Sequence, residues 1–373
     1  MKRIGIDARM YSAKFTGIGR YNYELIEHIT KNDPKNTYVI FLNSPEFESF
    51  DIKRPNVEKI KVNAGHYSLK EQTKFLWMLW KARLNLMHFT HFNSPLFYFG
   101  KQIVTIHDLT LSYFPGKKMN SFLYRLAYNL SIWAVTKKAV KIIAISENTK
   151  KDLMKLLKIP EKKIELIYEG ASDTFYKITD QTILSKTKTK YYLTKPFLLY
   201  AGVWRSHKNV EGLIHAFKIL KDQYKMDADL VITGKQDPLY HEIPDTIKNL
   251  HLENDVKLVG LVPEQDLVAL FNLAKIYVFP SFYEGFGLPA LEAFSVDLPV
   301  VSSNTSCLPE VCGENNAIFF DPYNHEDMAR KIYSVYSSPV LQEKLKKNGK
   351  ERLKDFSWEK MAKETLDLYL SVL

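Results

Sequence analysis

The 373-residue chain contains very little cysteine, with Cys307 and Cys312 as its two thiols. Two thiols do not suggest the disulfide framework on which small secreted domains rely. A single C-x4-C pair also supplies fewer than the four ligands of a structural zinc site. We therefore expect a reduced, cytoplasmic protein that folds without disulfide or metal crosslinks.

Long apolar segments are missing as well. The longest notable apolar run, residues 75–80, is far shorter than the roughly 20 residues that a membrane-spanning helix needs. The first residue is followed at once by the strand-like segment 2–8, which leaves no room for a signal peptide. We expect neither a membrane span nor export.

Several motifs of well-defined chemistry do not occur: the H-E-x-x-H zinc motif, the Walker phosphate loop, the EF-hand loop and the G-x-S-x-G elbow. The sequence therefore argues against metal-dependent hydrolysis and phosphoryl transfer as functions of this protein. A D-x-D sequence is present at Asp227 and Asp229, and in some nucleotide-sugar enzymes such a pair holds a divalent cation. Here it precedes an expected strand, at the amino edge of the sheet, so we interpret it as a solvated turn.

Acidic residues are scarce in the amino-terminal half. Residues 1–175 contain 28 Lys+Arg and 16 Asp+Glu, a balance of +12, whereas the remaining residues contain 24 and 26, a balance of −2. Nucleic acid, an anionic membrane and a phosphorylated small molecule would each be attracted to such a surface, so charge alone does not choose among them. No nucleic-acid motif is present, which favours the other two partners.

Aromatic and basic residues alternate in segments 66–83 and 112–138. Amphipathic helices of this composition can lie in a membrane interface. The alternative is an ordinary helix with a buried aromatic stripe and a solvated basic face.

Short apolar runs recur along the chain with helical patterns between them, which is typical of a parallel sheet covered by helices. A polar, lysine- and threonine-rich stretch at 174–195 is interpreted as a link between domains. We therefore expect an α/β protein with two tandem Rossmann-like domains, 1–180 and 190–355. The expected strands are 3–8, 38–42, 60–62, 86–89, 103–107, 142–145, 164–168, 197–201, 230–233, 256–259, 276–280 and 298–302.

The densest signal is the stretch 276–322, which is predicted to form a strand, a loop, a helix that starts near Pro289, and a second strand. Glu284 in the glycine-bearing loop and Glu292 in the helix would both lie near the carboxyl edge of the first strand, where open parallel sheets bind ligands. Their spacing also suits an acid/base pair. The alternative is that Glu284 is a loop charge and Glu292 a solvated helix residue.

Three further groups are candidates for the site. Gly202 ends a strand, and Arg205 and Lys208 follow it before a helix, where two cations could bind a diphosphate. His107 ends another strand in T-I-H-D-L-T and could orient a substrate or stabilise positive charge, although a merely hydrogen-bonded histidine explains it equally well. Gly17 and Gly19 are predicted to form a turn that opens a helix and presents N–H groups to a phosphate, with a plain tight turn as the alternative.

These segments together resemble the retaining nucleotide-sugar glycosyltransferases of family 4, which have the GT-B architecture. The resemblance covers nearly the whole chain in order: IGIDAR with TGIGRY, TIHDL, AISENTKKDL, IYEG, AGVWRSHKN, EGFGLPALEAF, PVVSSNTSCLPEVCG and FFDP. It implies two domains that face each other across a cleft. The first would bind the acceptor, the second the sugar nucleotide, and the final helix, 356–373, would cross back to the first.

The resemblance also implies roles for individual residues. Glu292 would bind the ribose hydroxyls and Glu284 the donor sugar, while Arg205 and Lys208 would neutralise the diphosphate. His107 would lie beside the transferred sugar. The remaining donor-side positions would provide backbone or small contacts, and they are Gly17, Gly19, Gly202, Phe286, Gly287 and Leu288. Many relatives carry Arg where this chain has Val203, so Arg205 is expected to supply that charge.

The implied reaction is hexosyl transfer with retention of the anomeric configuration and without a metal or other cofactor, by attack on the face that the diphosphate leaves. Mannose from GDP-mannose is the expected donor and a UDP-hexose the alternative. The acceptor would be a glycan or lipid-linked glycan of a surface polysaccharide, at the inner, anionic face of the cytoplasmic membrane. A nucleic-acid-binding protein, a GT-B epimerase and a catalytically silent sugar-nucleotide sensor stay open as alternatives.

Overall fold

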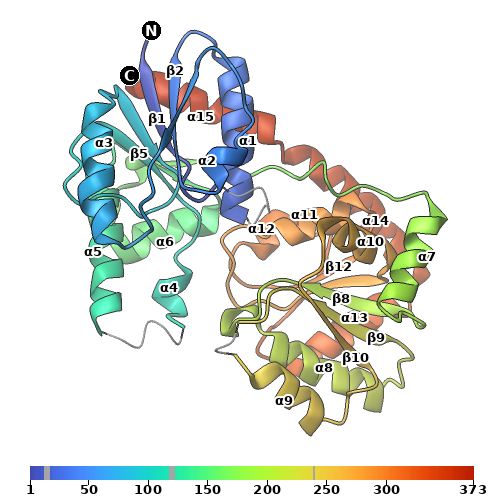
Figure 1. Ribbon diagram of the computed structural model, residues 1–373. Coiled ribbons are helices and arrows are strands. Elements are labelled where there is room, and N and C mark those ends of the chain that lie inside the picture. The colour runs from blue at the N-terminus through green and yellow to red at the C-terminus, as the bar shows by residue number, and fades with distance from the viewer. Residues whose placement is uncertain (12–16, 117–121, 238–239) are drawn as a thin grey trace. The chain divides into compact units, whose positions relative to one another are not determined.

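In the computed structural model, which describes residues 1–11, 17–116, 122–237 and 240–373, the chain forms two compact units (Figure 1). The first consists of Met1–Leu109, Lys118–Gly170 and Phe356–Leu373, and the second of Thr110–Lys117 and Ala171–Asp355. Each contains a parallel sheet with helices, so the predicted α/β class with two Rossmann-like parts is confirmed. Both ends of the chain belong to the first unit.

The first sheet has the strand order β3-β2-β1-β4-β5-β6-β7, and every pairing is parallel. Three of its inner strands are buried along their whole length and mostly apolar, as a sheet covered on both faces requires. The strands are β1 (Arg3–Asp7), β2 (Thr37–Leu42), β3 (Val57–Lys61), β4 (Leu86–Phe89), β5 (Gln102–Ile106), β6 (Lys141–Ala144) and β7 (Ile164–Leu166). The helices of this unit are α1 (Gly17–Asn32), α2 (Glu46–Ser49), α3 (Leu76–Lys81), α5 (Phe122–Lys138), α6 (Glu147–Leu157) and α15 (Trp358–Val372).

The strand order of this sheet reverses between β1 and β4. These neighbours are far apart in the sequence, and Asp7 at the end of β1 is in register with Phe89 at the end of β4. The connections that leave the two strands therefore diverge to opposite sides. Such a reversal point is where open α/β sheets bind ligands.

The second sheet has the order β10-β9-β8-β11-β12-β13, again with parallel pairing. Its own reversal point lies between β8 and β11. The strands are β8 (Phe197–Ala201), β9 (Asp229–Thr233), β10 (Val256–Gly260), β11 (Ile276–Phe279), β12 (Val300–Ser303) and β13 (Ile318–Phe320). The helices are α4 (Thr110–Tyr113), α7 (Gln181–Lys190), α8 (Val210–Asp222), α9 (Glu242–Asn249), α10 (Glu264–Leu273), α11 (Leu288–Ser295), α12 (Leu308–Cys312), α13 (His325–Tyr336) and α14 (Pro339–Arg352).

The structure differs from the expectations drawn from the sequence at several places. The polar stretch 174–195 is not simply a link, because Asp180 accepts a hydrogen bond from the Thr182 amide and starts α7, which packs against α10. The segment 66–83, which we expected to contain one helix, has a π-helical turn, Glu71–Phe75, followed by α3. Strand β13 was not predicted. The helix expected within the segment 112–138 is described from Phe122 onward, and residues 117–121 lie outside the described residues.

A buried chain of polar contacts ties α15 to the first sheet. The Tyr369 hydroxyl of α15 contacts Nδ1 of His88 at 2.5 Å, and Nε2 of His88 contacts Oγ1 of Thr105 at 2.8 Å. Thr105 in turn contacts the Tyr21 hydroxyl of α1 at 2.9 Å. Complete burial lowers the pKa of the His88 imidazole to about 3. His88 therefore stays neutral in the folded protein between about pH 6.5 and pH 3, a range in which an unfolded histidine is charged.

The neutral state of His88 predicts acid sensitivity. Below the usual histidine pKa of about 6.5, the unfolded chain binds a proton that the folded chain does not, so stability falls as the pH drops toward 3. His88→Gln removes this titration and keeps hydrogen-bonding capacity. Between pH 7 and pH 5 the unfolding free energy of the variant should fall by about 2 kcal/mol less than that of the wild type. Urea unfolding at both pH values measures the difference, and equal losses would contradict it.

Candidate functional site

The ends of β8 and β9 in the second unit meet through two glycines. Gly202 follows β8, and its N–H donates to the Thr233 carbonyl at 3.1 Å. Gly234 follows β9 with φ +133°, and a Cβ placed there would lie 1.9 Å from the Gly202 carbonyl oxygen. The predicted residue Gly202 thus lies where two backbones touch, and Gly234 makes that contact possible without having been predicted.

The loop after Gly202 carries the two predicted cations. Arg205 precedes a 3₁₀ turn, Ser206–Lys208, and its side chain is about half exposed, with Nε 3.5 Å from an Asp237 carboxylate oxygen. Asn209 is buried at the end of this turn with φ 52°. Its amide donates to the carbonyls of Pro280 at 3.1 Å and Pro322 at 3.0 Å, which lie beyond the ends of β11 and β13. Asn209 therefore positions the cationic loop against the carboxyl edge of the sheet.

Lys208 and Glu284 form the central pair of this site. Nζ of Lys208 lies 2.7 Å from each carboxylate oxygen of Glu284. The Ser281 hydroxyl donates to one of the same oxygens at 2.6 Å. The loop after β8 and the loop after β11 are thereby joined by a largely buried ion pair that is also hydrogen-bonded, the arrangement that a buried charge requires.

The backbone around Glu284 is held by the segment that follows β12. The Ser306 hydroxyl accepts from the Glu284 N–H at 3.0 Å and donates to its carbonyl at 2.6 Å. The Cys307 thiol donates to the Phe286 carbonyl at 3.0 Å, and burial raises the pKa of this thiol well above its usual range. Sequence reasoning did not find these residues, whose one signal is a run of small hydroxyl side chains after β12.

Helix α11 begins directly behind this loop. Gly287 precedes it with φ +108°, and a Cβ there would lie 2.9 Å from Cδ2 of Leu308. The predicted helix start at Pro289 is confirmed to within one residue, since α11 begins at Leu288. The Phe286 side chain is buried, so its backbone is the part available to a ligand. Glu292 lies on α11 and is partly buried.

In the first unit, the predicted glycine turn is wrong. Gly17 is the first residue of α1 and Gly19 lies inside its first turn, so both are helical; the preceding Thr16 lies outside the described residues. Gly17 is exposed, and a Cβ on it would meet no atom of the described residues within 4 Å, whereas Gly19 is buried.

His107 follows β5 and is buried, with both ring nitrogens engaged. Nε2 donates to the Thr90 carbonyl at 2.9 Å, and Nδ1 lies 3.1 Å from a Glu169 carboxylate oxygen. The ring packs edge-on against Tyr21 at 4.9 Å between centroids. The imidazole is therefore held in one orientation. Glu169, which sequence reasoning missed, is one of the groups that hold it.

The D-x-D pair lies away from these loops, as expected, but the prediction of a solvated turn is wrong for Asp229, which is buried. Asp229 is the first residue of β9 and pairs with Lys257 at 3.3 Å, and the exposed Asp227 pairs with Lys195 at 2.9 Å. Both carboxylates are thus engaged by lysines at the amino edge of the second sheet. Across the described ranges, no group of three or more His, Cys, Asp or Glu side chains is arranged to hold a metal ion.

Comparison with known proteins places this geometry in context. Residues 15–174 match the family model for "Glycosyltransferase Family 4", and residues 182–352 match the model for "Glycosyl transferases group 1". The chain is 25% identical over 372 residues to the O-antigen chain mannosyltransferase B of Escherichia coli, which covers 95% of this chain and 96% of that protein.

Solved structures share the fold over the whole chain. Sucrose-phosphate synthase from Thermosynechococcus elongatus superposes with a TM-score of 0.80 at 20% identity, covering 100% of this chain and 99% of that one. HepE from Anabaena, solved in complex with UDP, superposes with a TM-score of 0.75 at 18% identity and covers 100% of both chains. At these identities the likeness concerns the fold.

The contact between Gly202 and Gly234 predicts a large loss of stability on substitution. Gly234→Ala would place its methyl group 1.9 Å from a backbone oxygen that cannot move freely, and we expect a cost of at least about 3 kcal/mol. Gly260→Ala is the matched control, because Gly260 also has a positive φ, of 67°, but has open space around it; its cost should be about 1 kcal/mol. Chemical unfolding of both variants measures the difference, and equal losses would refute the packing argument.

Proposed function

Because the chain belongs to the glycosyltransferases of group 1 and family 4, with the GT-B fold, we propose that it transfers a hexosyl group from a nucleoside-diphosphate sugar to a glycan or lipid-linked glycan in surface polysaccharide synthesis. The observation that carries this proposal is the Lys208–Glu284 pair at the carboxyl edge of the second sheet, beside the N-terminus of α11. A cation and a helix N-terminus are partners that favour binding of a diphosphate.

Mannose is the proposed sugar and GDP-mannose the proposed donor. The support is the similarity over 95% of the chain to a protein named as an O-antigen chain mannosyltransferase. A UDP-hexose is the second candidate, favoured by the shared fold with HepE, which was solved with UDP.

Each proposed role uses a position that the folded chain makes available. Lys208 and Arg205 would neutralise the diphosphate, with backbone contacts from Gly202, Gly287 and Leu288. Glu292 would bind the ribose. On the first unit, Gly17 and Gly19 would contribute small residues at a helix start, and His107 an imidazole held in one orientation.

Glu284 is proposed to position the donor sugar instead of attacking it. One of its carboxylate oxygens is bound by Lys208 and Ser281 and the other by Lys208. A carboxylate with this many partners is a poor nucleophile but a rigid acceptor for sugar hydroxyls. The same-face mechanism with retention requires a positioning group of this kind, because the departing diphosphate itself takes the acceptor proton.

The proposed reaction does not require a metal. Charge that develops on the leaving diphosphate would be stabilised by the two cationic side chains and the α11 N-terminus, which need no reorganisation during the reaction. Activity that depends on an added divalent cation, or that a chelator abolishes, would overturn this part of the proposal.

Substitutions at the donor site provide the main test. Lys208→Ala and Glu292→Ala should each lower sugar transfer by orders of magnitude while the protein stays folded, because each removes a charged contact to the donor. Lys218→Ala, which removes a surface lysine of α8 that pairs with Asp222, should have no effect. The measurement is turnover of a panel of GDP- and UDP-sugars, with and without acceptor. Near-normal turnover in either site variant would contradict the assignment of the donor site. Donor binding without any turnover would favour the alternative of a catalytically silent sugar-nucleotide sensor.

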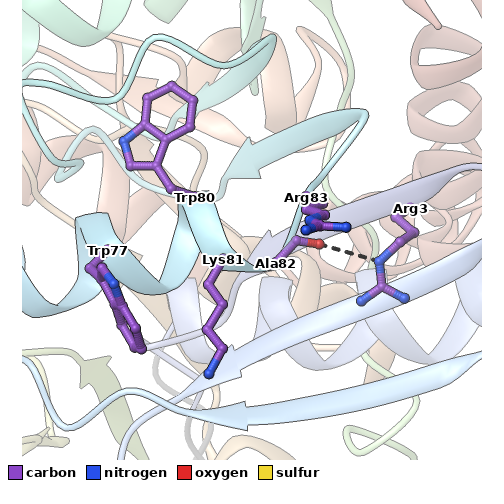
Figure 2. A pocket seen from close by; sticks show the side chains of 6 residues that line it. All are labelled: Arg3, Trp77, Trp80, Lys81, Ala82 and Arg83. Atoms are coloured by element: carbon purple, nitrogen blue, oxygen red, sulfur yellow. Dashed lines mark hydrogen bonds between the residues drawn. The ribbon is translucent and has the colours of Figure 1, made fainter.

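We also propose that the first unit contacts an anionic membrane. On α3, Trp77 and Trp80 are 60% and 51% exposed, and with Arg3, Lys81, Ala82 and Arg83 they line a surface pocket (Figure 2). Exposed tryptophans beside cations are typical of surfaces that lie in the headgroup region of a bilayer.

The loop between β4 and β5 extends this surface. Phe97 and Phe99 are exposed, the ring of the intervening Tyr98 packs against Trp80 at 5.3 Å, and Lys138 of α5 donates to the Tyr98 carbonyl at 3.2 Å. We call Trp77, Trp80, Phe97 and Phe99 the aromatic face. Within the described ranges, no helix combines the length and apolarity that a membrane crossing requires, so the contact would be with the bilayer surface.

Removing the two tryptophans tests the aromatic face. The double variant Trp77→Ser, Trp80→Ser should bind vesicles that contain phosphatidylglycerol at least roughly tenfold more weakly, because it loses apolar area that enters the interface. Tyr192→Ser in the second unit, which removes an aromatic ring that is even more exposed, is the control and should bind normally. Vesicle co-sedimentation measures both. Wild-type binding that is unchanged by salt or by replacing the anionic lipid with phosphatidylcholine would contradict the proposal.

A further inference from the structure

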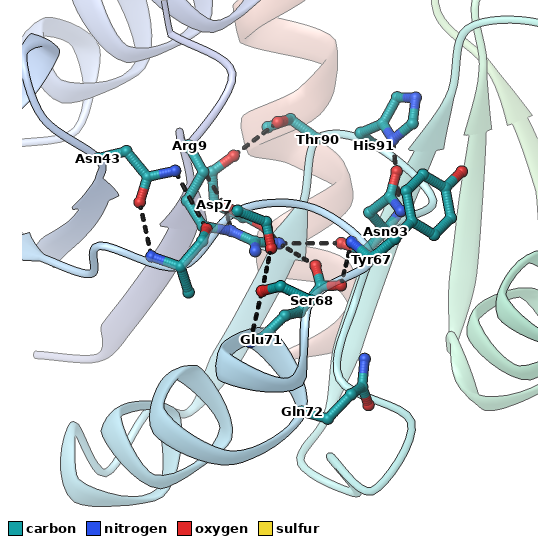
Figure 3. Close-up of polar contacts among 12 residues, drawn as sticks. Asp7, Arg9, Asn43, Tyr67, Ser68, Glu71, Gln72, Thr90, His91 and Asn93 are labelled. Carbon is teal, nitrogen blue, oxygen red and sulfur yellow. Dashed lines mark hydrogen bonds and ion pairs between the residues drawn. The ribbon is translucent and has the colours of Figure 1, made fainter. Parts of the chain in front are cut away.

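The reversal point of the first sheet carries a polar cluster that the donor site does not use. Asp7 and Arg9 lie at the end of β1, and His91 and Asn93 follow β4, whose end is in register with that of β1. His66 lies in the connection between β3 and α3 and faces the same group, with its ring 6.4 Å from that of His91. Figure 3 shows most of these side chains converging at one place.

The cluster is built on a buried arginine that is already neutralised. Nε and Nη2 of Arg9 each lie 2.8 Å from an oxygen of Asp7, and Nη2 lies 2.8 Å from Oε1 of Glu71. The guanidinium stacks on the Phe75 ring at 4.2 Å. Two carboxylates against one guanidinium leave no positive charge in excess, so a phosphate or another anion would not be attracted here.

Two buried polar atoms of this cluster have no hydrogen-bond partner within the part of the chain that the structure describes, Nη1 of Arg9 and Nδ1 of His66. The Asn93 amide interacts with the side chains of Tyr67 and His91, which belong to the same cluster. Asn93 is 2% exposed. Folded proteins pair almost all of their buried polar groups, so unpaired atoms gathered at one place call for a bound polar molecule. These atoms offer both donors and acceptors.

The histidines add neutral groups of the same kind. Burial, with a smaller effect of Arg9, lowers the pKa of His66 to about 4, and burial lowers the pKa of His91 well below its usual value. Both rings are therefore uncharged near pH 7, and a neutral imidazole offers one donor and one acceptor. Tyr67 lies beside Asn93 with half of its surface exposed and in a left-handed conformation, φ 57°, which costs energy for a residue of this size (Figure 3).

We propose that this cluster, formed by Arg9, His66, Tyr67, His91 and Asn93, binds an uncharged pyranose ring of the glycan acceptor through its hydroxyl groups. The inference rests on the proposed function, which requires an acceptor, and adds where on this chain the acceptor sugar is recognised. A sugar hydroxyl both donates and accepts, as the unpaired atoms require. The absence of excess positive charge distinguishes this site from one for a lipid phosphate.

The test measures binding of simple glycosides directly, without a donor. The probes are octyl α-D-mannopyranoside and octyl β-D-glucopyranoside, with octyl phosphate as the anionic counterpart that has the same chain. Titration followed by ligand-observed NMR should show that the wild type binds at least one glycoside and that octyl phosphate does not displace it. His66→Ala and Asn93→Leu should each weaken glycoside binding by about threefold to tenfold, the effect of losing one or two neutral hydrogen bonds.

A matched control and an independent readout distinguish a failure of this inference from a failure of the proposed function. His28→Ala removes a partly exposed histidine on α1 of the same unit and should bind the glycosides as the wild type does. His66 is itself partly exposed, so its variant tests the site even if Asn93→Leu fails to fold. Hydrolysis of the GDP- and UDP-sugar panel by the wild type reports on the proposed function separately. The inference is overturned if neither glycoside binds the wild type, if octyl phosphate displaces the glycoside, or if the folded His66→Ala protein binds as tightly as the wild type.

Discussion

Parallel pairing of the strands is the constraint on which the rest of this structure depends. Every described pairing in both sheets is parallel, so successive strands must be joined by crossovers and the loops that follow the strands meet at one edge. Residues far apart in the sequence become neighbours for that reason. Lys208 follows β8 and Glu284 follows β11, and they form an ion pair because those strands are adjacent at the reversal point of the second sheet.

The two reversal points differ in how their polar groups are satisfied. In the second unit, Glu284, Lys208 and Asn209 have partners, and hydroxyl groups beyond β12 hold the loop that carries Glu284. A ligand that binds there would meet a rigid surface and would replace few of the existing hydrogen bonds. Such a surface suits a charged donor that must be held in one position. In the first unit, Nη1 of Arg9 and Nδ1 of His66 have no hydrogen-bond partner among the described residues. A site of that kind gains hydrogen bonds when a neutral ligand binds. This would suit recognition of an acceptor, which we expect to be weaker and more varied than recognition of the donor.

The buried polar chain from Tyr369 to Tyr21 connects the C-terminal helix to the strands of the first unit. Because His88 and Thr105 lie on neighbouring strands, β4 and β5, α15 is joined to the sheet by directional contacts in addition to its packing on α1. The same strands end at the loops that carry His91 and His107. The position of α15 therefore bears on the geometry of both loops, even though it contributes no residue to them.

The sequence by itself determined the class of the fold, nearly all of its strands and the start of α11, because these follow from local apolar periodicity and from the chemistry of helix starts. It also named Arg205, Lys208, Glu284 and Glu292 as candidates for a donor site, and their roles stay predictions. It placed Gly17 and Gly19 in a turn, and it missed α7 and β13, whose short or polar sequences are weak local signals. Tertiary structure alone decided that Lys208 contacts Glu284, that Glu169 holds His107, that Gly234 must be glycine, and that Ser306 and Cys307 clamp the Glu284 loop. Each of these depends on which strands are neighbours and how closely their loops approach, and no local pattern in a single sequence encodes those distances.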